Sequence, residues 1–122
     1  MTFFSIVLPT YNDLENLKKC LKSIDRQTYK NFELIIVNDG SNDDTEIYLN
    51  KLNISYLKII NLKKNSGPAY ARNTAILNSS GMWLCFIDSD DFWFKRKLEV
   101  MKNIIQEKSN YKVFCHNLIL KN

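Results

Sequence analysis

Short apolar runs alternate with segments of helical periodicity along the whole chain. Four runs of large apolar residues have the length of buried strands, at residues 3–9, 32–38, 56–61 and 82–87. Between them, apolar residues recur at the spacing of one face of a helix. Strands that alternate with helices predict an α/β domain around a mostly parallel sheet. In such a domain, ligands bind at the carboxyl ends of the strands.

The helices are predicted from this spacing and from the residues at their boundaries. Asn12 and Glu15 indicate a capping box before the first helix. The second helix starts near Asp44, and Gly67-Pro68 opens the third, because proline suits a first helical turn. A fourth helix and a last strand at residues 112–118 complete the pattern. The side chains expected to face the core are Leu14, Leu17, Leu21, Ile24, Tyr48, Leu49, Leu52, Ala69, Ala71, Ala75, Ile76, Phe94, Leu98, Met101 and Ile105.

The composition excludes several classes of protein. A length of 122 residues suits one domain, which we expect to span residues 1–122. The net charge of +4 comes from lysines scattered over the predicted helix surfaces, so it favours weak attraction to anionic ligands or membranes and forms no nucleic-acid groove. The sequence shows neither a signal-peptide pattern nor an apolar run near the ~20 residues of a membrane span. We therefore expect a cytoplasmic protein without a nucleic-acid partner.

The cysteines are expected to be reduced thiols in the core. Cys20, Cys85 and Cys115 are odd in number, far apart in the sequence and set among apolar residues. A disulfide framework and a zinc site both have other spacings, so the pattern favours a reducing compartment.

An acidic cluster follows the fourth apolar run directly, as Asp88-Ser89-Asp90-Asp91. Alternate residues of an extended chain point the same way, so Asp88 and Asp90 can converge on one ion, with Asp91 nearby in the exit loop. Carboxylates packed so closely repel one another, and a hard divalent cation such as Mg²⁺ or Mn²⁺ relieves that repulsion. Considered alone, the cluster has an equally good explanation as solvated turn formers.

Other polar residues follow the first two strands and are expected on the same rim of the sheet. Tyr11 offers a flat face for a base, and Asp39 accepts hydrogen bonds. Arg72, on the third helix, carries a guanidinium that suits phosphate or a base carbonyl. Each of these residues also has a purely structural explanation. Tyr11 would be an aromatic at a strand end, Asp39 part of a turn and helix cap, and Arg72 a surface residue of its helix. Their joint placement favours a nucleoside diphosphate site.

Four motifs in one order resemble the nucleotide-binding half of family 2 glycosyltransferases. They are residues 5–12 (SIVLPTYN), 35–41 (IIVNDGS), 65–73 (NSGPAYARN) and 86–91 (FIDSDD). The resemblance covers nearly the whole chain. It implies the GT-A fold, a Rossmann-like three-layer sandwich with helices on both faces of a mostly parallel sheet.

The resemblance also implies roles for single residues. The nucleotide-binding residues would be Pro9, Thr10, Tyr11, Asn12, Asp39, Arg72, Asp88 and Ser89, and the metal-binding residues Asp90, Asp88 and Asp91. Thr10 and Tyr11 would contact the base, and Asp39 its ring nitrogen. Arg72 would reach the base or the diphosphate. Asp88 would lie near the ribose, while Asp90 would hold the Mg²⁺ or Mn²⁺ that bridges the diphosphate.

The implied reaction is transfer of a sugar from a nucleotide sugar with inversion at the anomeric carbon. A UDP-sugar is the expected donor, although the residues also admit guanosine or thymidine nucleotides. The expected acceptor is a glycan or a lipid-linked glycan in bacterial surface polysaccharide synthesis. The full-length enzyme would then associate peripherally with the inner membrane face.

The general base of such enzymes lies in an acceptor-binding half that follows the metal motif. We expect it beyond residue 122, in which case this chain is a fragment that transfers little or no sugar by itself. A lone histidine on a strand is more often structural, so His116 is not assigned as the base. Trp83, Phe92 and Trp93 are candidates for an apolar face that the missing half covers, and such a face favours self-association.

Other functions fit the residues less well. In a haloacid dehalogenase phosphatase the Asp-x-Asp follows the first strand, and a nucleotidyltransferase needs a glycine-rich loop there. A calcium loop needs a glycine where Asp44 stands. The alternative that stays open is a nucleotide-sugar-binding module without transferase activity, which keeps the same donor residues.

Overall fold

The apolar runs form a four-stranded sheet in the computed structural model, which describes residues 1–117. The strands are β1 (Phe4–Thr10), β2 (Phe32–Asn38), β3 (Leu57–Asn61) and β4 (Trp83–Phe86). Their order is β3-β2-β1-β4, and every pairing among them is parallel. The register places Phe4 of β1 opposite Phe32 and Trp83. The predicted parallel sheet is therefore confirmed.

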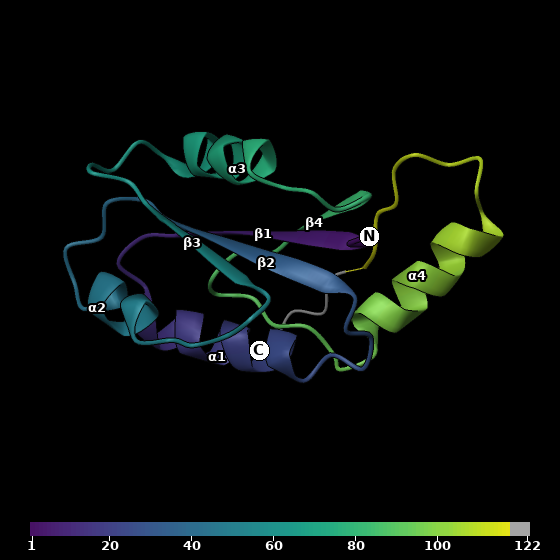
Figure 1. The fold of residues 1–122 in the computed structure, drawn as a ribbon, viewed down its shortest axis with the longest axis horizontal. Helices are drawn as coiled ribbons and strands as arrows, with labels where there is room; N and C mark the ends of the chain where they lie inside the picture. Colours follow the sequence, from purple (N-terminus) through teal and green to yellow (C-terminus); the bar gives the residue numbers. More distant parts are fainter. Residues whose placement is uncertain (118–122) are drawn as a thin grey trace.

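Four helices cover the sheet on both faces: α1 (Leu14–Asp25), α2 (Thr45–Asn50), α3 (Pro68–Leu77) and α4 (Lys97–Glu107). In Figure 1, α3 lies above the sheet, α1 and α2 lie below it, and α4 lies to the right. The strands run away from the N-terminus, so their carboxyl ends lie at the left of this view. Within residues 1–117, none of the helices is long and apolar enough to cross a membrane.

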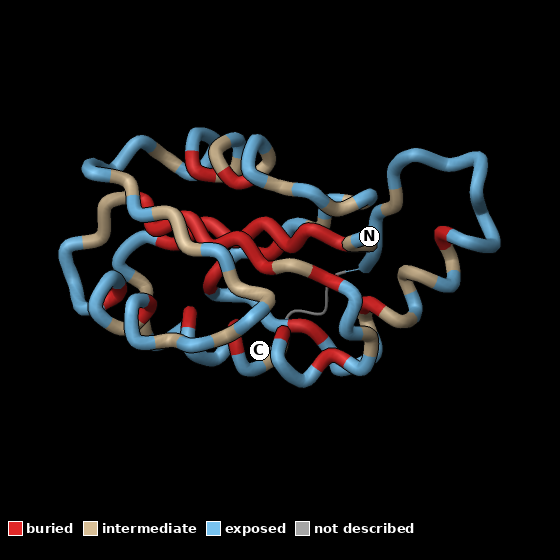
Figure 2. Tube along the Cα trace, viewed as in Figure 1, coloured by how far each residue is buried: buried red, intermediate tan, exposed pale blue. Residues whose placement is uncertain are grey.

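The two faces of β1 and β2 bury different layers of the core. Phe4, Ile6 and Leu8 pack with α1, because alternate residues of a strand point to the same face. The intervening Val7 packs with two alanines of α3, whose small side chains let the helix approach closely. Figure 2 shows both strands buried along most of their length. The centre of the sheet is thus a rigid support for the loops at its carboxyl edge.

The fourth apolar run is an edge strand and not a fully buried one, which corrects the prediction. β4 pairs with β1 alone, and α3 packs over β1 and β2. Phe86 is therefore 51% exposed, and Leu84 is exposed as well. Of the residues predicted to form an apolar face, Phe92 is exposed, Trp83 is half-buried and Trp93 is buried. Self-association stays a prediction.

One predicted strand and one predicted helix cap are wrong. Residues 112–117 form no strand, and Leu118, the end of that prediction, lies outside the described residues. The capping box is absent at the start of α1, where Asp13 and not Asn12 precedes the helix. Asn12 has a φ of 47°, in the left-handed region that asparagine tolerates better than most residues. Its side chain bonds to a neighbouring loop instead of capping the helix.

Several side chains lie further from the core than predicted. Phe94 is 67% exposed, because α4 begins only at Lys97. Ala69 is exposed on α3, and Cys115 is exposed in the segment after α4, while Cys20 is buried and Cys85 half-buried. The half-buried members of the predicted set are Leu14, Tyr48, Leu52, Ile76 and Met101.

Candidate functional site

The loops at the carboxyl edge of the sheet enclose one open pocket of about 570 Å³. This volume lies in the usual range for small-molecule sites. The structure brings all eight predicted nucleotide-binding residues into its lining, together with residues that were not predicted. The lining residues are Pro9, Thr10, Tyr11, Asn12, Asp13, Asp39, Asn65, Gly67, Pro68, Arg72, Asp88, Ser89 and Asp90.

Asp39, directly after β2, organises the loop on which α3 begins. Its buried carboxylate accepts hydrogen bonds from Ser66 N at 2.8 Å, Gly67 N at 2.9 Å and Asn65 Nδ2 at 3.1 Å. Among the described residues, Ser66 N alone donates to Oδ1, so this oxygen keeps one acceptor position for a ligand. The neighbouring Gly40 has a φ of 70°, and a Cβ there would collide with the backbone at Asn65. A glycine is required for this close approach.

The loop after β1 is fastened to the loop after β2. Asn12 N donates to Ser41 Oγ at 3.0 Å, and Asn12 Oδ1 accepts from Asn42 N at 2.8 Å. Tyr11 precedes this double link and is 47% exposed at the pocket. Thr10 is buried, and its Oγ1 has no hydrogen-bond partner among the described residues. The backbone that carries Tyr11 is therefore fixed, while its ring stays accessible.

The acidic cluster has the donor set of a site for a hard divalent cation. Asp88, Asp90 and Asp91 are exposed, and each offers a carboxylate oxygen within 4.8 Å of the others. Partial desolvation, followed by the charges of Asp90 and Asp88, raises the pKa of Asp91. A bound cation relieves such repulsion, and three carboxylates with room for water suit Mg²⁺ or Mn²⁺. The residues present therefore fit the expected metal.

Arg72 of α3 reaches the acidic cluster. Its Nη2 forms an ion pair with Asp88 Oδ1 at 2.7 Å, although both side chains are substantially exposed. The amino end of α3, with Gly67 and Pro68, lines the same pocket. Helix amino ends and guanidinium groups both favour anions. One side of the pocket thus attracts phosphate, and the carboxylates beside it attract a cation.

Sequence reasoning missed the polar residues that hold this site together. The backbone N–H groups of Ser66 and Gly67 bind Asp39, and Asp13 accepts a hydrogen bond from Ser89 at 2.9 Å. Asn65, Ser66 and Gly67 stand in one of the recognised motifs, which was the available signal for them. The sequence contains no such signal for Asp13, because Ser89, its hydrogen-bond partner, is 76 residues away.

Cys20 of α1 contacts the backbone of the acidic cluster. Its Sγ donates to the carbonyl of Asp88 at 3.7 Å. Burial, followed by the charges of Asp91, Asp90, Asp88 and Asp13, raises the pKa of this thiol to about 12, so it stays protonated and able to donate. The core position predicted for Cys20 is confirmed, with this contact in addition.

A larger groove of about 860 Å³ lies away from the candidate site. It runs between β4, α4 and residues 112–116, and aromatic and aliphatic side chains form most of its walls. His116 lines this groove and not the pocket at the strand ends. Its position gives it no contact with the acidic cluster.

The amino-acid sequence matches a known family and several curated proteins. The family described as Glycosyl transferase family 2 matches residues 5–119. An uncharacterized glycosyltransferase of Rickettsia conorii is 40% identical over an alignment of 119 residues, and the match covers 94% of this chain and 19% of that protein. UDP-Glc:alpha-D-GlcNAc-diphosphoundecaprenol beta-1,3-glucosyltransferase WfgD of Escherichia coli is 34% identical over an alignment of 122 residues, and the match covers 95% of this chain and 48% of that protein. The chain spans about half, or less, of the length of these relatives.

The fold matches solved structures as well. The crystal structure of S. aureus TarS 1-349 in complex with UDP-GlcNAc has a TM-score of 0.79 and 36% sequence identity. The match covers 88% of this chain and 32% of that chain. This similarity confirms the predicted α/β fold of the GT-A type.

Proposed function

This chain belongs to glycosyl transferase family 2, and on that premise we propose that its pocket binds the nucleotide part of a UDP-sugar, whose sugar the complete protein transfers. The observation that carries the proposal is the convergence of Tyr11, Asp39, Arg72, Asp88 and Asp90 on one pocket, with Asp91 grouped beside the last two. A relative named as a UDP-glucose-dependent glucosyltransferase and the TarS complex with UDP-GlcNAc support uridine as the base.

Each part of the pocket has a task in this proposal. The exposed ring of Tyr11 stacks on the uracil, and the free acceptor position of Asp39 Oδ1 receives the N–H of its ring. Arg72 binds the diphosphate and turns away from Asp88 to do so. Asp90, with Asp88 and Asp91, holds Mg²⁺ or Mn²⁺. When bound, the cation stabilises the negative charge of the leaving diphosphate as a Lewis acid.

The acceptor proposed for the complete protein is a glycan or a lipid-linked glycan of bacterial surface polysaccharide. The name of the E. coli relative, with its diphosphoundecaprenol acceptor, supports this class. Transfer also needs a general base that takes the proton of the attacking hydroxyl. In the described pocket, Asp39 and Asp13 already accept hydrogen bonds and the other carboxylates face the cation site. As the resemblance to the family implies, we propose that the base lies beyond residue 122 in the complete protein.

Removal of the cation, or of the Asp90 carboxylate, should strongly weaken nucleotide binding. Calorimetric titration of the chain with UDP should give micromolar to millimolar affinity with Mn²⁺ or Mg²⁺, and much weaker binding with EDTA. Asp90→Ala should lower the affinity in Mn²⁺ to the level measured with EDTA, because the diphosphate then loses its counter-charge. Asp44→Ala, an aspartate before α2 that does not line the pocket, should bind as the wild type does.

Three results would contradict different parts of this assignment. A wild-type chain that binds no UDP under any condition would refute the nucleotide site. UDP binding that is equally strong with Mn²⁺ and with EDTA would leave the nucleotide site intact and refute the role of the acidic cluster. Titration with GDP gives the base preference, and tighter binding of GDP than UDP would refute the uridine assignment.

Replacement of Tyr11 should weaken UDP binding and leave the metal requirement unchanged. Tyr11→Ala removes the exposed ring, so the binding free energy should fall by roughly 1–3 kcal/mol, as for base–aromatic stacking elsewhere. Tyr111→Ala, an exposed tyrosine outside the pocket, is the matched control. An unchanged affinity in Tyr11→Ala would remove this residue from the site.

A further inference from the structure

Asp13 stands immediately before α1, where an aspartate usually accepts a hydrogen bond from the first helical turn. Within the described chain, its carboxylate receives no such bond from the backbone of α1. Instead, Oδ2 accepts from Ser89 Oγ at 2.9 Å and Oδ1 accepts from Asn16 Nδ2 at 2.9 Å. The side chain therefore links the start of α1 to a residue 76 positions later in the sequence.

Ser89 is the residue between two of the proposed metal ligands. It is only 8% exposed, while Asp88 and Asp90 on either side of it are exposed. The hydroxyl thus points inward to Asp13 and the two flanking carboxylates reach the solvent. The backbone of the same turn has a second anchor in α1, because the carbonyl of Asp88 accepts from Cys20 Sγ and also from Asp91 N.

We infer that Asp13 is a positioning residue for the divalent cation, which it does not itself contact. By holding Ser89, it fixes the turn from Asp88 to Asp91 against α1, with the three carboxylate oxygens within 4.8 Å of one another. Like charges at this spacing repel, so a turn without that anchor would let the carboxylates move apart. Such positioning increases the affinity for the cation, because the ligands are already close together when the cation binds. The inference rests on the proposed nucleotide and metal site.

The test measures Mn²⁺ directly and does not depend on sugar transfer. Free Mn²⁺ is followed by electron paramagnetic resonance during titration of the chain with UDP present, and UDP affinity is measured by calorimetry. Asp13→Ala and Ser89→Ala should each weaken Mn²⁺ binding by about 10-fold, the lower end of the effect of losing an outer hydrogen-bonding partner. The double variant should bind no worse than either single variant, because both substitutions break the same link.

Asp13→Asn separates the hydrogen bond from the charge. Its amide oxygen still accepts from Ser89, and the amide of Asn16 can rotate to face the new NH₂ group, so Mn²⁺ affinity should stay close to that of the wild type. Asp44→Ala, which also stands before a helix and makes no side-chain cap, controls for the lost charge. Thermal unfolding of every variant separates a loss of fold from a loss of positioning.

Each outcome decides the inference. Equal Mn²⁺ affinity in Asp13→Ala, Ser89→Ala and the wild type would overturn it, while UDP binding in the same titration would keep the proposed function. A loss in Asp13→Asn as large as in Asp13→Ala would also overturn it, since the charge and not the link would then matter. A wild-type chain without Mn²⁺-dependent UDP binding would refute the proposed function itself.

Discussion

Asp39→Asn is expected to lower both the stability of the fold and the affinity for UDP. The carboxylate receives three donors from the segment before α3, and two of them are backbone N–H groups. Asparagine has only one acceptor oxygen, so at least one of these donors loses its partner in either amide orientation. Because the site is buried, the free energy of unfolding should fall by about 1–3 kcal/mol. The base-binding acceptor is lost in the same substitution when the amide NH₂ replaces Oδ1.

Urea unfolding and UDP titration together separate the two roles of Asp39. Asp43→Asn is the matched control, because Asp43 lies in the same loop but accepts a single hydrogen bond, from Thr45 N, which asparagine can also accept. Wild-type stability in Asp39→Asn would show that the carboxylate does not hold the loop before α3. A folded variant with lower stability and normal UDP affinity would limit Asp39 to a structural role.

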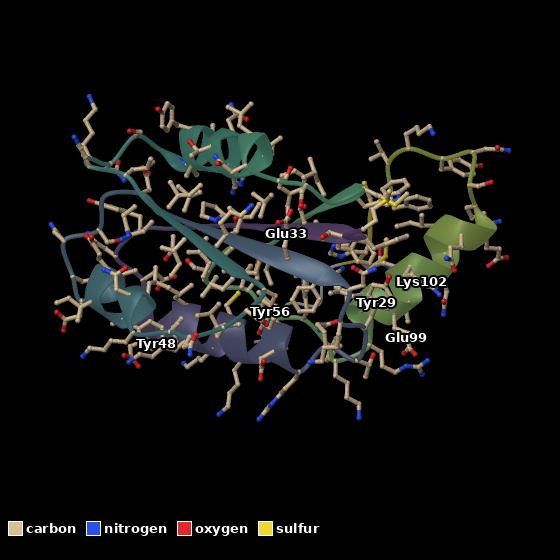
Figure 3. All side chains as sticks on the ribbon, in the orientation of Figure 1. Tyr29, Glu33, Tyr48, Tyr56, Glu99 and Lys102 are labelled. Carbon is tan, nitrogen blue, oxygen red and sulfur yellow. The ribbon has the colours of Figure 1, made fainter. Side chains whose placement is uncertain are left out.

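Glu33→Gln is expected to destabilise the opposite end of the sheet. Glu33 Oε1 on β2 accepts from Ser5 Oγ at 2.6 Å, Ser80 N at 2.6 Å and Ser80 Oγ at 3.0 Å. Ser5 Oγ in turn accepts from Gly81 N, just before β4 (Glu33 is labelled in Figure 3). The carboxylate thus joins β1, β2 and the segment that leads into β4. Loss of these charged hydrogen bonds should lower the free energy of unfolding by about 1–3 kcal/mol.

The same carboxylate gives the stability a defined dependence on pH. Burial by itself would raise the pKa of Glu33, but the hydrogen bonds from Ser5 and Ser80 and the charge of Lys58 outweigh it and lower the pKa from 4.5 to about 2. The folded state therefore binds this proton less readily than the unfolded state. Its contribution, roughly 3 kcal/mol, is complete above the unfolded value of 4.5 and is lost as the pH falls from there towards 2.

Urea unfolding across this pH range checks the prediction for Glu33. The stability difference between the wild type and Glu33→Gln should be largest near neutral pH and should shrink as the pH falls below 4.5. Glu46→Gln, on the exposed side of α2, should follow the wild type at every pH. A difference that stays constant with pH would mean that the carboxylate charge does not contribute, and that only the shape of the side chain matters.

Local pattern was sufficient for the order of strands and helices, and it failed where tertiary contacts override local preference. The last predicted strand contains the apolar run Val113-Phe114-Cys115, yet residues 112–117 do not join the sheet. Asn12 and Glu15 match a capping box, but the Asn12 side chain instead accepts a hydrogen bond from Asn42 N in the loop after β2. Leu84 and Phe86 read as buried because periodicity cannot tell a central strand from an edge strand.

Part of the candidate site could likewise be predicted from the sequence and part could not. Tyr11, Asp39, Arg72 and the acidic cluster were predicted because strand ends of a parallel sheet meet at one edge, and this follows from the pattern alone. The hydrogen-bonding partners of these residues were not predicted, because a bond such as Asp13–Ser89 joins positions 76 residues apart. A periodic pattern carries no information about which side chains meet across such a distance.

The sequence by itself determined the alternation of strands and helices, and with it the edge of the sheet where the polar residues gather. The spacing of apolar residues is a local property, because it follows from which face of a strand or helix each residue occupies. Only the tertiary structure decided that Asp39 accepts hydrogen bonds from the loop before α3, and that Asp13 accepts one from Ser89 in the acidic turn. It also decided that β4 lies at an edge of the sheet. Those features depend on distances and angles between elements, which the packing of the whole chain sets.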